Sequence, residues 1–132
     1  MKILIETLYE TQEGKIIVTG RNPIGLIKGT WKSINIPLVN EEYDVELTLP
    51  ILSGDAVMIE ESHLPAQSLV DSNDRLYLRG KCEVIDEDNI YVIRFNTNWI
   101  EMLEIEANKI DVNDIISFTV PVNQVEINPI SW

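Results

Sequence analysis

The chain has 132 residues, with 22 Asp or Glu against ten Lys or Arg, and a formal net charge of −12 at pH 7. This length is enough for one domain with its own apolar core. Affinity for nucleic acid comes largely from cationic contacts to phosphate, so the charge disfavours DNA, RNA and anionic membrane surfaces as partners. It favours a basic protein partner or a metal cation.

Cys82 is the single cysteine, so no disulfide can form within the chain. This fits a reducing compartment. The first residues carry acid too early for a signal peptide, and no stretch approaches the roughly 18 apolar residues that suggest a spanning helix. We therefore expect a cytoplasmic protein that forms a single β domain over residues 1–132.

The first half of the chain begins with a predicted hairpin. Residues 2–9 and 15–19 are rich in β-branched and aliphatic side chains and flank the turn signal 11–14. The clearest strand–loop–strand unit follows at residues 25–50. Trp31 lies in this unit and is expected as a core aromatic or a lid over the core, with an exposed anchor for a partner as the alternative.

Strict alternation marks residues 43–49 as a strand with one apolar face. The apolar side chains are Tyr43, Val45, Leu47 and Leu49. The polar side chains that alternate with them are Asp44, Glu46 and Thr48. Because strand side chains alternate between two faces, the first set is expected inward and the second in solvent. Pro50 ends the run, since it lacks the N–H that a ladder needs.

A hairpin is predicted in the middle of the chain. Residues 56–60 predict a short strand, whereas 61–74 have few β signals and at most a helical turn within 62–70. Residues 75–85 alternate again and pair with 90–95 through the polar turn 86–89. The face expected to point inward comprises Leu76, Leu78, Gly80, Cys82 and Val84.

Three further strands are predicted towards the end of the chain, at residues 100–107, 115–120 and 124–127. In the first of them Leu103, Ile105 and Ala107 are expected inward. About nine or ten short strands and no long amphipathic helix are typical of an all-β fold. We expect a barrel or barrel-like sandwich of mainly antiparallel strands.

Two segments of the chain resemble each other. Residues 39–50 and 112–121 both run from a Val-Asn pair through an alternating strand to a proline. Either the fold holds two related β units or the match arose by chance.

No catalytic group, metal ligand set or cofactor site is expected. The carboxylates, such as Glu104 and Glu106, are expected as surface charge, and the acidic run 86–89 as a hairpin turn rather than a Ca²⁺ loop. His63 is the only histidine, which excludes a multi-histidine metal site within one chain. Cys82 lies on an apolar strand face, which favours an inert core thiol.

Residues 33–74 contain no Lys or Arg, and this span directs the functional hypothesis. We expect a non-enzymatic acidic protein that binds a basic protein partner, with association favoured by complementary charge. The carboxylates expected to contribute are Glu41, Glu42, Asp55, Glu60 and Glu61.

Two alternatives remain open. One is a structural subunit that forms a homo-oligomer through a β surface and through Trp31, Trp99 or Trp132. The other is a carboxylate-dependent hydrolase, which requires a cleft with two inward carboxyl groups and a shifted pKa.

One sequence pattern is formed by Gly29-Thr30-Trp31, residues 42–47 and Pro50. This pattern resembles that of a group of small, acidic bacterial β-proteins, some of which are similar to immunity proteins of polymorphic or contact-dependent toxin systems. The likeness covers residues 24–50, with a looser match of β pattern to about Val120. Residues 51–54 depart from it, because members tend to carry a tryptophan shortly after the proline. The resemblance implies neutralisation of a basic toxin and brings no functional residues with it.

Overall fold

The computed structural model describes residues 1–106 and 109–130. About 60% of the chain is strand and 5% is helical, so the expected all-β class is confirmed. In the described part of the chain, no helix is long and apolar enough to cross a membrane. The elements in order are β1 (Lys2–Glu10), β2 (Ile16–Asn22), β3 (Gly25–Trp31), β4 (Glu42–Thr48), β5 (Leu52–Ser53), η1 (Gly54–Ala56), β6 (Val57–Glu60), β7 (Gln67–Val70), β8 (Arg75–Ile85), β9 (Ile90–Asn96), β10 (Trp99–Glu106), β11 (Ile115–Pro121), η2 (Val122–Gln124) and β12 (Glu126–Pro129).

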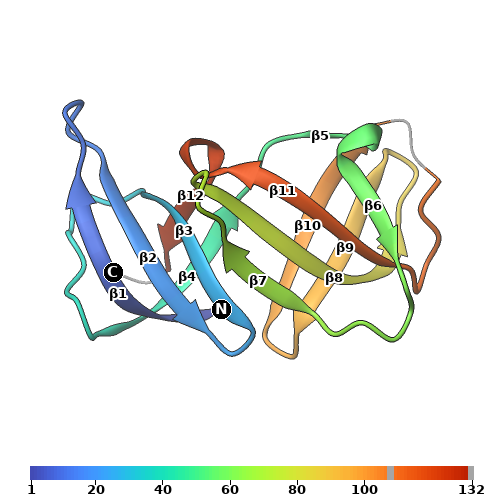
Figure 1. The fold of residues 1–132 in the computed structure, drawn as a ribbon, viewed down its shortest axis with the longest axis horizontal. Coiled ribbons are helices and arrows are strands. Elements are labelled where there is room, and N and C mark those ends of the chain that lie inside the picture. Colours follow the sequence, from blue (N-terminus) through green and yellow to red (C-terminus); the bar gives the residue numbers. More distant parts are fainter. Residues whose placement is uncertain (107–108, 131–132) are drawn as a thin grey trace.

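Five strands close a barrel, which confirms the expected barrel architecture. The order is β12-β4-β1-β2-β3, and the ring closes because β12 pairs with β4 on one side and with β3 on the other (Figure 1). Gly29 of β3 lies where β12 approaches. An added Cβ would sit 2.7 Å from the carbonyl oxygen of Val125, and that carbonyl accepts a 2.9 Å hydrogen bond from the N–H of Thr30.

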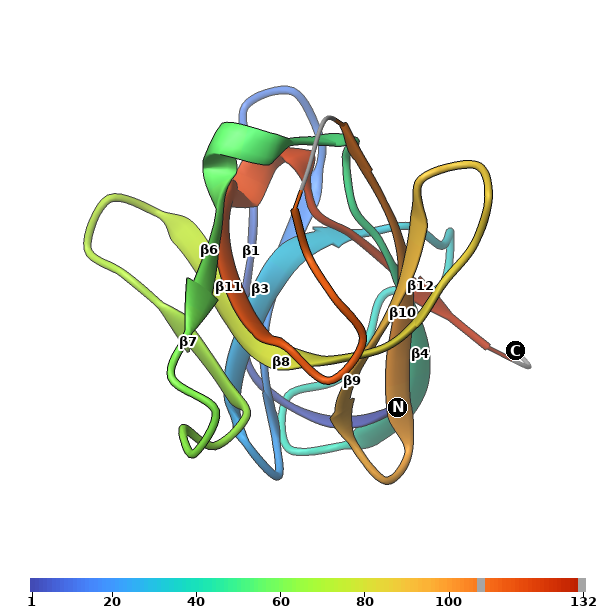
Figure 2. The same ribbon diagram turned by 90° about the vertical axis from the view of Figure 1, so that its right-hand side faces the viewer.

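The remaining strands form a second, curved sheet beside the barrel (Figure 2). Its order is β6-β11-β8-β9-β10-β5, and β7 pairs with the first part of β8. The pairing of β5 with β10 is parallel, through Leu52 and Ile105. The two sheets are connected where β3 meets β7 at Gly25 and Ser68.

The chain has two halves with similar strand order, β1–β6 and β8–β12, and they exchange their last strands. β5 and β6 come after β4 in the chain but pair with β10 and β11 of the second sheet, whereas β12 comes after β11 but pairs with β4 of the barrel. Each half therefore completes its sheet with a strand from the other half of the chain (Figure 1).

The similarity between the two Val-Asn segments is present in the backbone. Asn40 and Asn113 both adopt the left-handed conformation, with φ of 70° and 77°. Asparagine tolerates this region better than most residues because its short polar side chain bonds locally. Each turn makes the same three backbone hydrogen bonds. In the first turn, Asn40 N donates to Ile5 O, Ile5 N to Glu41 O and Glu41 N to Leu38 O. In the second turn, Asn113 N donates to Cys82 O, Cys82 N to Asp114 O and Asp114 N to Asp111 O.

The strands that receive these turns are also alike. β1 and β8 each contain a register shift, at Glu6 and at Glu83. In each case an arginine of the next strand donates through Nε to that glutamate, from Arg21 to Glu6 and from Arg94 to Glu83. The bulge in β8 corrects one expectation. Val84 is exposed instead of inward, because the extra residue reverses the alternation after Cys82.

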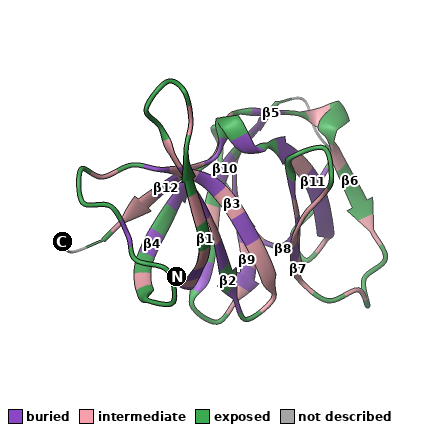
Figure 3. Cartoon of the chain, turned by 60° about the vertical axis from the view of Figure 1, so that its left-hand side comes forward, coloured by how far each residue is buried: buried purple, intermediate pink, exposed green. Residues whose placement is uncertain are grey.

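The core follows the inward faces of both sheets (Figure 3). Trp31 and Trp99 are buried within the chain, so the expectation of Trp31 as a core aromatic is confirmed and neither ring offers a surface to an oligomer partner. Trp31 packs edge-on against Tyr43, with ring centroids 5.3 Å apart. Trp132 and Ala107 lie outside the described residues.

Residues 67–70 form a strand, where the sequence predicted at most a helical turn. β7 is held by pairing with β8 and by Ser68, whose N–H donates to Ile24 O at 3.2 Å and whose hydroxyl donates to Leu26 O. Gly25 makes this contact feasible, because a Cβ at its φ of 141° would overlap the Ser68 carbonyl. The helical turns lie instead at η1 and η2.

Candidate partner-binding surface

Residues 32–41, here called the apolar loop, connect β3 to β4 and expose a cluster of aliphatic side chains. The exposed fractions are 97% for Ile34, 57% for Ile36, 64% for Leu38 and 45% for Val39. Single exposed apolar side chains are ordinary on a protein surface, but four in one short loop favour an interaction site.

The apolar loop is fixed by hydrogen bonds to aromatic side chains beneath it. The indole N–H of Trp31 donates to Asn35 O at 2.7 Å, and the Tyr43 hydroxyl accepts from the N–H of Leu38 at 2.8 Å. The N–H of Asn35 also donates to the Ser33 hydroxyl at 3.1 Å. A loop held in one conformation loses less entropy when a partner binds.

An acidic row continues from the apolar loop along β4. Glu42, Asp44 and Glu46 are all exposed, while Val45 between the last two and Leu47 after them are buried. Alternate residues of a strand share a face at a spacing of about 7 Å, so the three carboxylates form a line on the solvent side. The predicted partner-binding residues Glu41 and Glu42 lie at the junction of the loop and this row.

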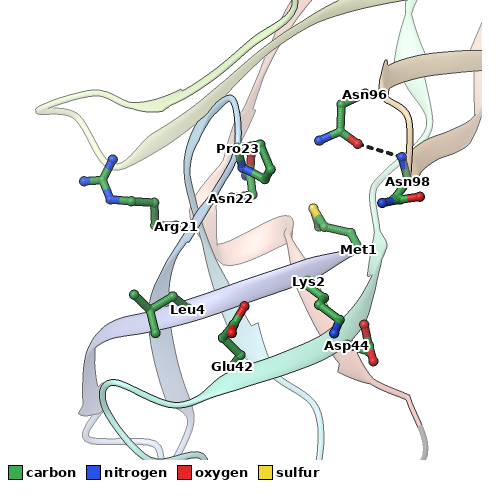
Figure 4. A pocket seen from close by; sticks show the side chains of 10 residues that line it. All are labelled: Met1, Lys2, Leu4, Arg21, Asn22, Pro23, Glu42, Asp44, Asn96 and Asn98. Atoms are coloured by element: carbon green, nitrogen blue, oxygen red, sulfur yellow. Dashed lines mark hydrogen bonds between the residues drawn. The ribbon is translucent and has the colours of Figure 1, made fainter.

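A cavity of about 470 Å³, here called the seam cavity, opens between the barrel and the β9–β10 turn. Figure 4 shows its lining, which combines carboxylates, amides, cations and apolar stems and consists of Met1, Lys2, Leu4, Arg21, Asn22, Pro23, Glu42, Asp44, Asn96 and Asn98. Two of the amides cap neighbouring turns, since Asn22 Oδ1 accepts from Ile24 N at 2.9 Å and Asn96 Oδ1 from Asn98 N at 2.8 Å.

The Asn22 side chain differs from the other polar groups around the seam cavity in having a buried donor without an acceptor. It is only 6% exposed, and its Nδ2 is a buried donor for which the described structure provides no acceptor. A buried donor without a partner costs free energy, and Nδ2 is closed to solvent, so this cost belongs to the packing of the chain.

A second cavity of about 200 Å³ continues the seam and shares Met1 and Asn98 with the first. It contains Glu46, the last member of the acidic row, and Glu101 from β10. The two cavities therefore follow the acidic row along the junction between the halves.

Glu101 corrects the expectation that the carboxylates of β10 are all surface charge. It lies in the same phase as the buried Leu103 and Ile105, so its side chain points inward. Burial, together with the nearby charge of Glu46, raises its pKa from 4.5 to about 7 against the opposing effect of a 3.3 Å hydrogen bond from the Trp99 indole. The alternation carried this signal, because Glu101 falls two residues before Leu103.

The other predicted partner-binding residues lie at the opposite end of the molecule from β4, around β6 (Figure 1). Asp55 is exposed in η1 and Glu61 is exposed after β6, while Glu60 is half-buried and accepts a 2.6 Å hydrogen bond from the Ser117 hydroxyl. The five predicted residues therefore fall into two groups, and Glu41 and Glu42 belong to the one beside the apolar loop.

Other candidate reactive groups have structural surroundings. Cys82 is buried as expected, and burial raises the pKa of its thiol, so the reactive thiolate is disfavoured. Asp86 Oδ1 accepts from Asp88 N at 2.7 Å and Ile90 N at 3.2 Å, as in a hairpin turn. Over residues 1–106 and 109–130, no three His, Cys, Asp or Glu side chains cluster as a metal site would need.

Comparison with protein-family models, curated proteins and solved structures gave no match.

Proposed function

We propose that this protein is a non-enzymatic binding protein that neutralises a basic protein partner, as an immunity protein neutralises a toxin. One observation supports this above the others. Four aliphatic side chains are held in water on a braced loop, directly beside the acidic row.

The two parts of this surface contribute differently to binding. Apolar side chains that leave water on association supply affinity, because each Å² of buried apolar surface is favourable by about 25 cal/mol before the entropy cost of association is subtracted. The carboxylates accelerate encounter with a cationic surface and discriminate against acidic partners. A chain with net charge −12 and no Lys or Arg in residues 33–74 provides that field.

The proposal is tested by affinity capture from the native host, using the wild-type protein and the double variant Ile34→Ser/Leu38→Ser as baits. Both side chains are exposed, so the variant should fold normally. We expect the wild-type bait alone to retain a protein with a basic surface, and we expect that protein's toxicity in a growth assay to be suppressed by co-expression of the wild type.

A matched control bait carries Met58→Ser and Ile59→Ser, which change two exposed apolar side chains on β6. It should retain the partner. Equal capture by all three baits, or an affinity that is unchanged between about 50 and 300 mM salt, would contradict the proposal, since exposed charge pairs are screened by salt.

A carboxylate-dependent hydrolase is the second candidate, and Glu101 is the observation that favours it. A general acid needs a pKa near neutrality, and Glu101 shares its cavity with Glu46. The test is a panel of chromogenic esters and glycosides. Turnover that is lost in both Glu101→Gln and Glu46→Gln would support this candidate, and turnover that survives either change would count against it.

A further inference from the structure

We propose that the seam cavity and the acidic row receive an extended basic segment of the partner, with one arginine side chain entering the seam cavity. This inference rests on the proposed function and adds the chemistry by which the partner is recognised. It is carried by two features that lie together: the line of carboxylates and the cavity at its side.

The acidic row has the periodicity of an extended ligand. Glu42, Asp44 and Glu46 project from alternate positions of one strand. An extended peptide has the same repeat of two residues, so basic side chains at alternate positions of the segment would each meet a carboxylate. Pairs of this kind combine charge with hydrogen bonding.

The seam cavity suits a long cationic side chain with a planar head. Its volume of about 470 Å³ exceeds what one side chain fills and leaves room for the adjoining backbone. Met1, Leu4 and Pro23 provide apolar walls for an aliphatic stem. Glu42 and Asp44 provide the oxygen acceptors that a guanidinium fork needs.

The repeat of the acidic row supplies the argument for a peptide rather than a free cation. Carboxylates on alternate residues of β4 match side chains on alternate residues of an extended segment, which a single small cation does not offer.

The cations already in the cavity allow a test of whether the ligand is cationic or anionic. The Arg21 guanidinium is engaged by Glu6 through a 2.7 Å hydrogen bond, and the Met1 ammonium donates to Val45 O at 3.2 Å. Lys2 pairs with Asp44 across the β1–β4 ladder, so its ammonium shares the cavity with the carboxylate that the arginine needs. Removing the Lys2 charge should strengthen the binding of a basic segment, whereas a site for anions would respond in the opposite direction.

The probe is the capped peptide acetyl-Gly-Arg-Gly-Arg-Gly-amide, with a peptide of the same length in which citrulline replaces arginine as its neutral control. Binding is followed by two-dimensional NMR of the full chain. We expect the arginine peptide to shift the side-chain amide resonances of Asn22 and Asn98. The citrulline peptide should bind at least about ten-fold more weakly, since each 1.4 kcal/mol is a factor of ten.

Three variants complete the experiment. The triple variant Glu42→Gln/Asp44→Asn/Glu46→Gln should weaken the arginine peptide about ten-fold or more, and Lys2→Gln should strengthen it several-fold. The control Glu10→Gln/Glu87→Gln/Asp88→Asn changes the net charge equally at exposed sites elsewhere and should leave binding within about two-fold.

Equal affinity for the two peptides, equal weakening by the two triple variants, or weaker binding by Lys2→Gln would each overturn the inference. The outcome is separable from that of the proposed function. Loss of partner capture in the apolar-loop variant together with no arginine preference would leave the binding protein standing and reject the arginine site. Arginine-specific shifts without a loop-dependent partner would reject the proposed function and retain the site.

Discussion

The two halves of the molecule share the same bulge and turn in the backbone and differ in the side chains that precede the turn. Both have a bulged first strand with a Glu–Arg pair and a left-handed asparagine before the fourth strand. Before Asn40 the chain exposes four aliphatic side chains, whereas before Asn113 the side chain of Ile110 is buried and that of Val112 is exposed. The shared features maintain the scaffold, and the apolar loop is an addition to one half.

The exchanged strands differ as well. β12 closes the barrel and buries Ile127 completely, whereas β6 lies outside β11 with Ile59 52% exposed. Exchange between the halves therefore does not by itself explain how deeply a strand is buried. We expect a strand inside the closed ring to contribute more to stability than a strand at the edge of the second sheet.

The largest effect is expected from a matched pair of truncations in these strands. Ile127→Ala should lower the free energy of unfolding by about 3 kcal/mol, because it leaves a cavity in the core. Ile59→Ala should cost less than about 0.5 kcal/mol, as exposed substitutions do. Urea denaturation followed by circular dichroism measures both, and similar costs would refute the distinction between the strands.

Glu101 provides the next largest contrast, because the first half has the buried Ile27 at the same position. The equivalence follows from the ladders, in which Ile27 pairs with Gly20 opposite Ile5, and Glu101 pairs with Ile93 opposite Cys82. One half thus directs a carboxyl group towards the interior where the other directs an alkyl group.

Because the pKa of Glu101 is raised from 4.5 to about 7, the native state holds more protons than the unfolded state between these values. The stability that this carboxyl group contributes is present below pH 4.5 and is lost as the pH rises towards 7. Glu101→Gln keeps an acceptor for the Trp99 indole and should be more stable than wild type by about 2 kcal/mol at pH 8, with no advantage at pH 4. Denaturation at both pH values checks this, and a gain that does not change with pH would exclude titration as its cause.

The two asparagine turns should respond equally to substitution. Asn40→Ala and Asn113→Ala should each cost about 1 kcal/mol, because alanine is strained at φ of 70° and 77°. Asn→Gly at either site should restore the loss, since glycine adopts this conformation freely. Thermal unfolding of the four variants is the measurement, and an alanine variant as stable as its glycine counterpart would show that the left-handed conformation is not required.

The smallest effect concerns the two bulge ion pairs. Arg94 donates to Glu83, to Asn96 O at 3.2 Å and to Thr97 O at 3.0 Å, whereas within the described part of the chain Arg21 has only its exposed pair with Glu6. Arg94→Ala should cost about 1 kcal/mol and Arg21→Ala about 0.5 kcal/mol or less. Equal costs in a denaturation series would mean that the carbonyl contacts of Arg94 contribute nothing.

Local pattern was sufficient to predict most of the strands and the inward face of β4, since alternation is read from neighbouring residues. It failed at Val84, where a bulge reverses the alternation, and at β7, whose pairing depends on residues distant in sequence such as Gly25. The exchange of β6 and β12 has no local signature.

The candidate site was predicted only in part. The basic-free span drew attention to Glu41 and Glu42, which lie beside the apolar loop, and equally to Asp55, Glu60 and Glu61, which the fold places at the other end of the molecule (Figure 1). The sequence does not show how far apart two acidic segments lie once the chain is folded. The unpartnered amide of Asn22 is likewise a property of packing.

The division of the acidic residues between two ends allows the most direct test of the account. Hydrogen exchange of the complex with the captured basic partner reports which backbone segments become protected. We predict protection in the apolar loop and β4, and in the turns at residues 22–25 and 96–98, with residues 54–61 unchanged. Protection confined to residues 54–61 would contradict the account.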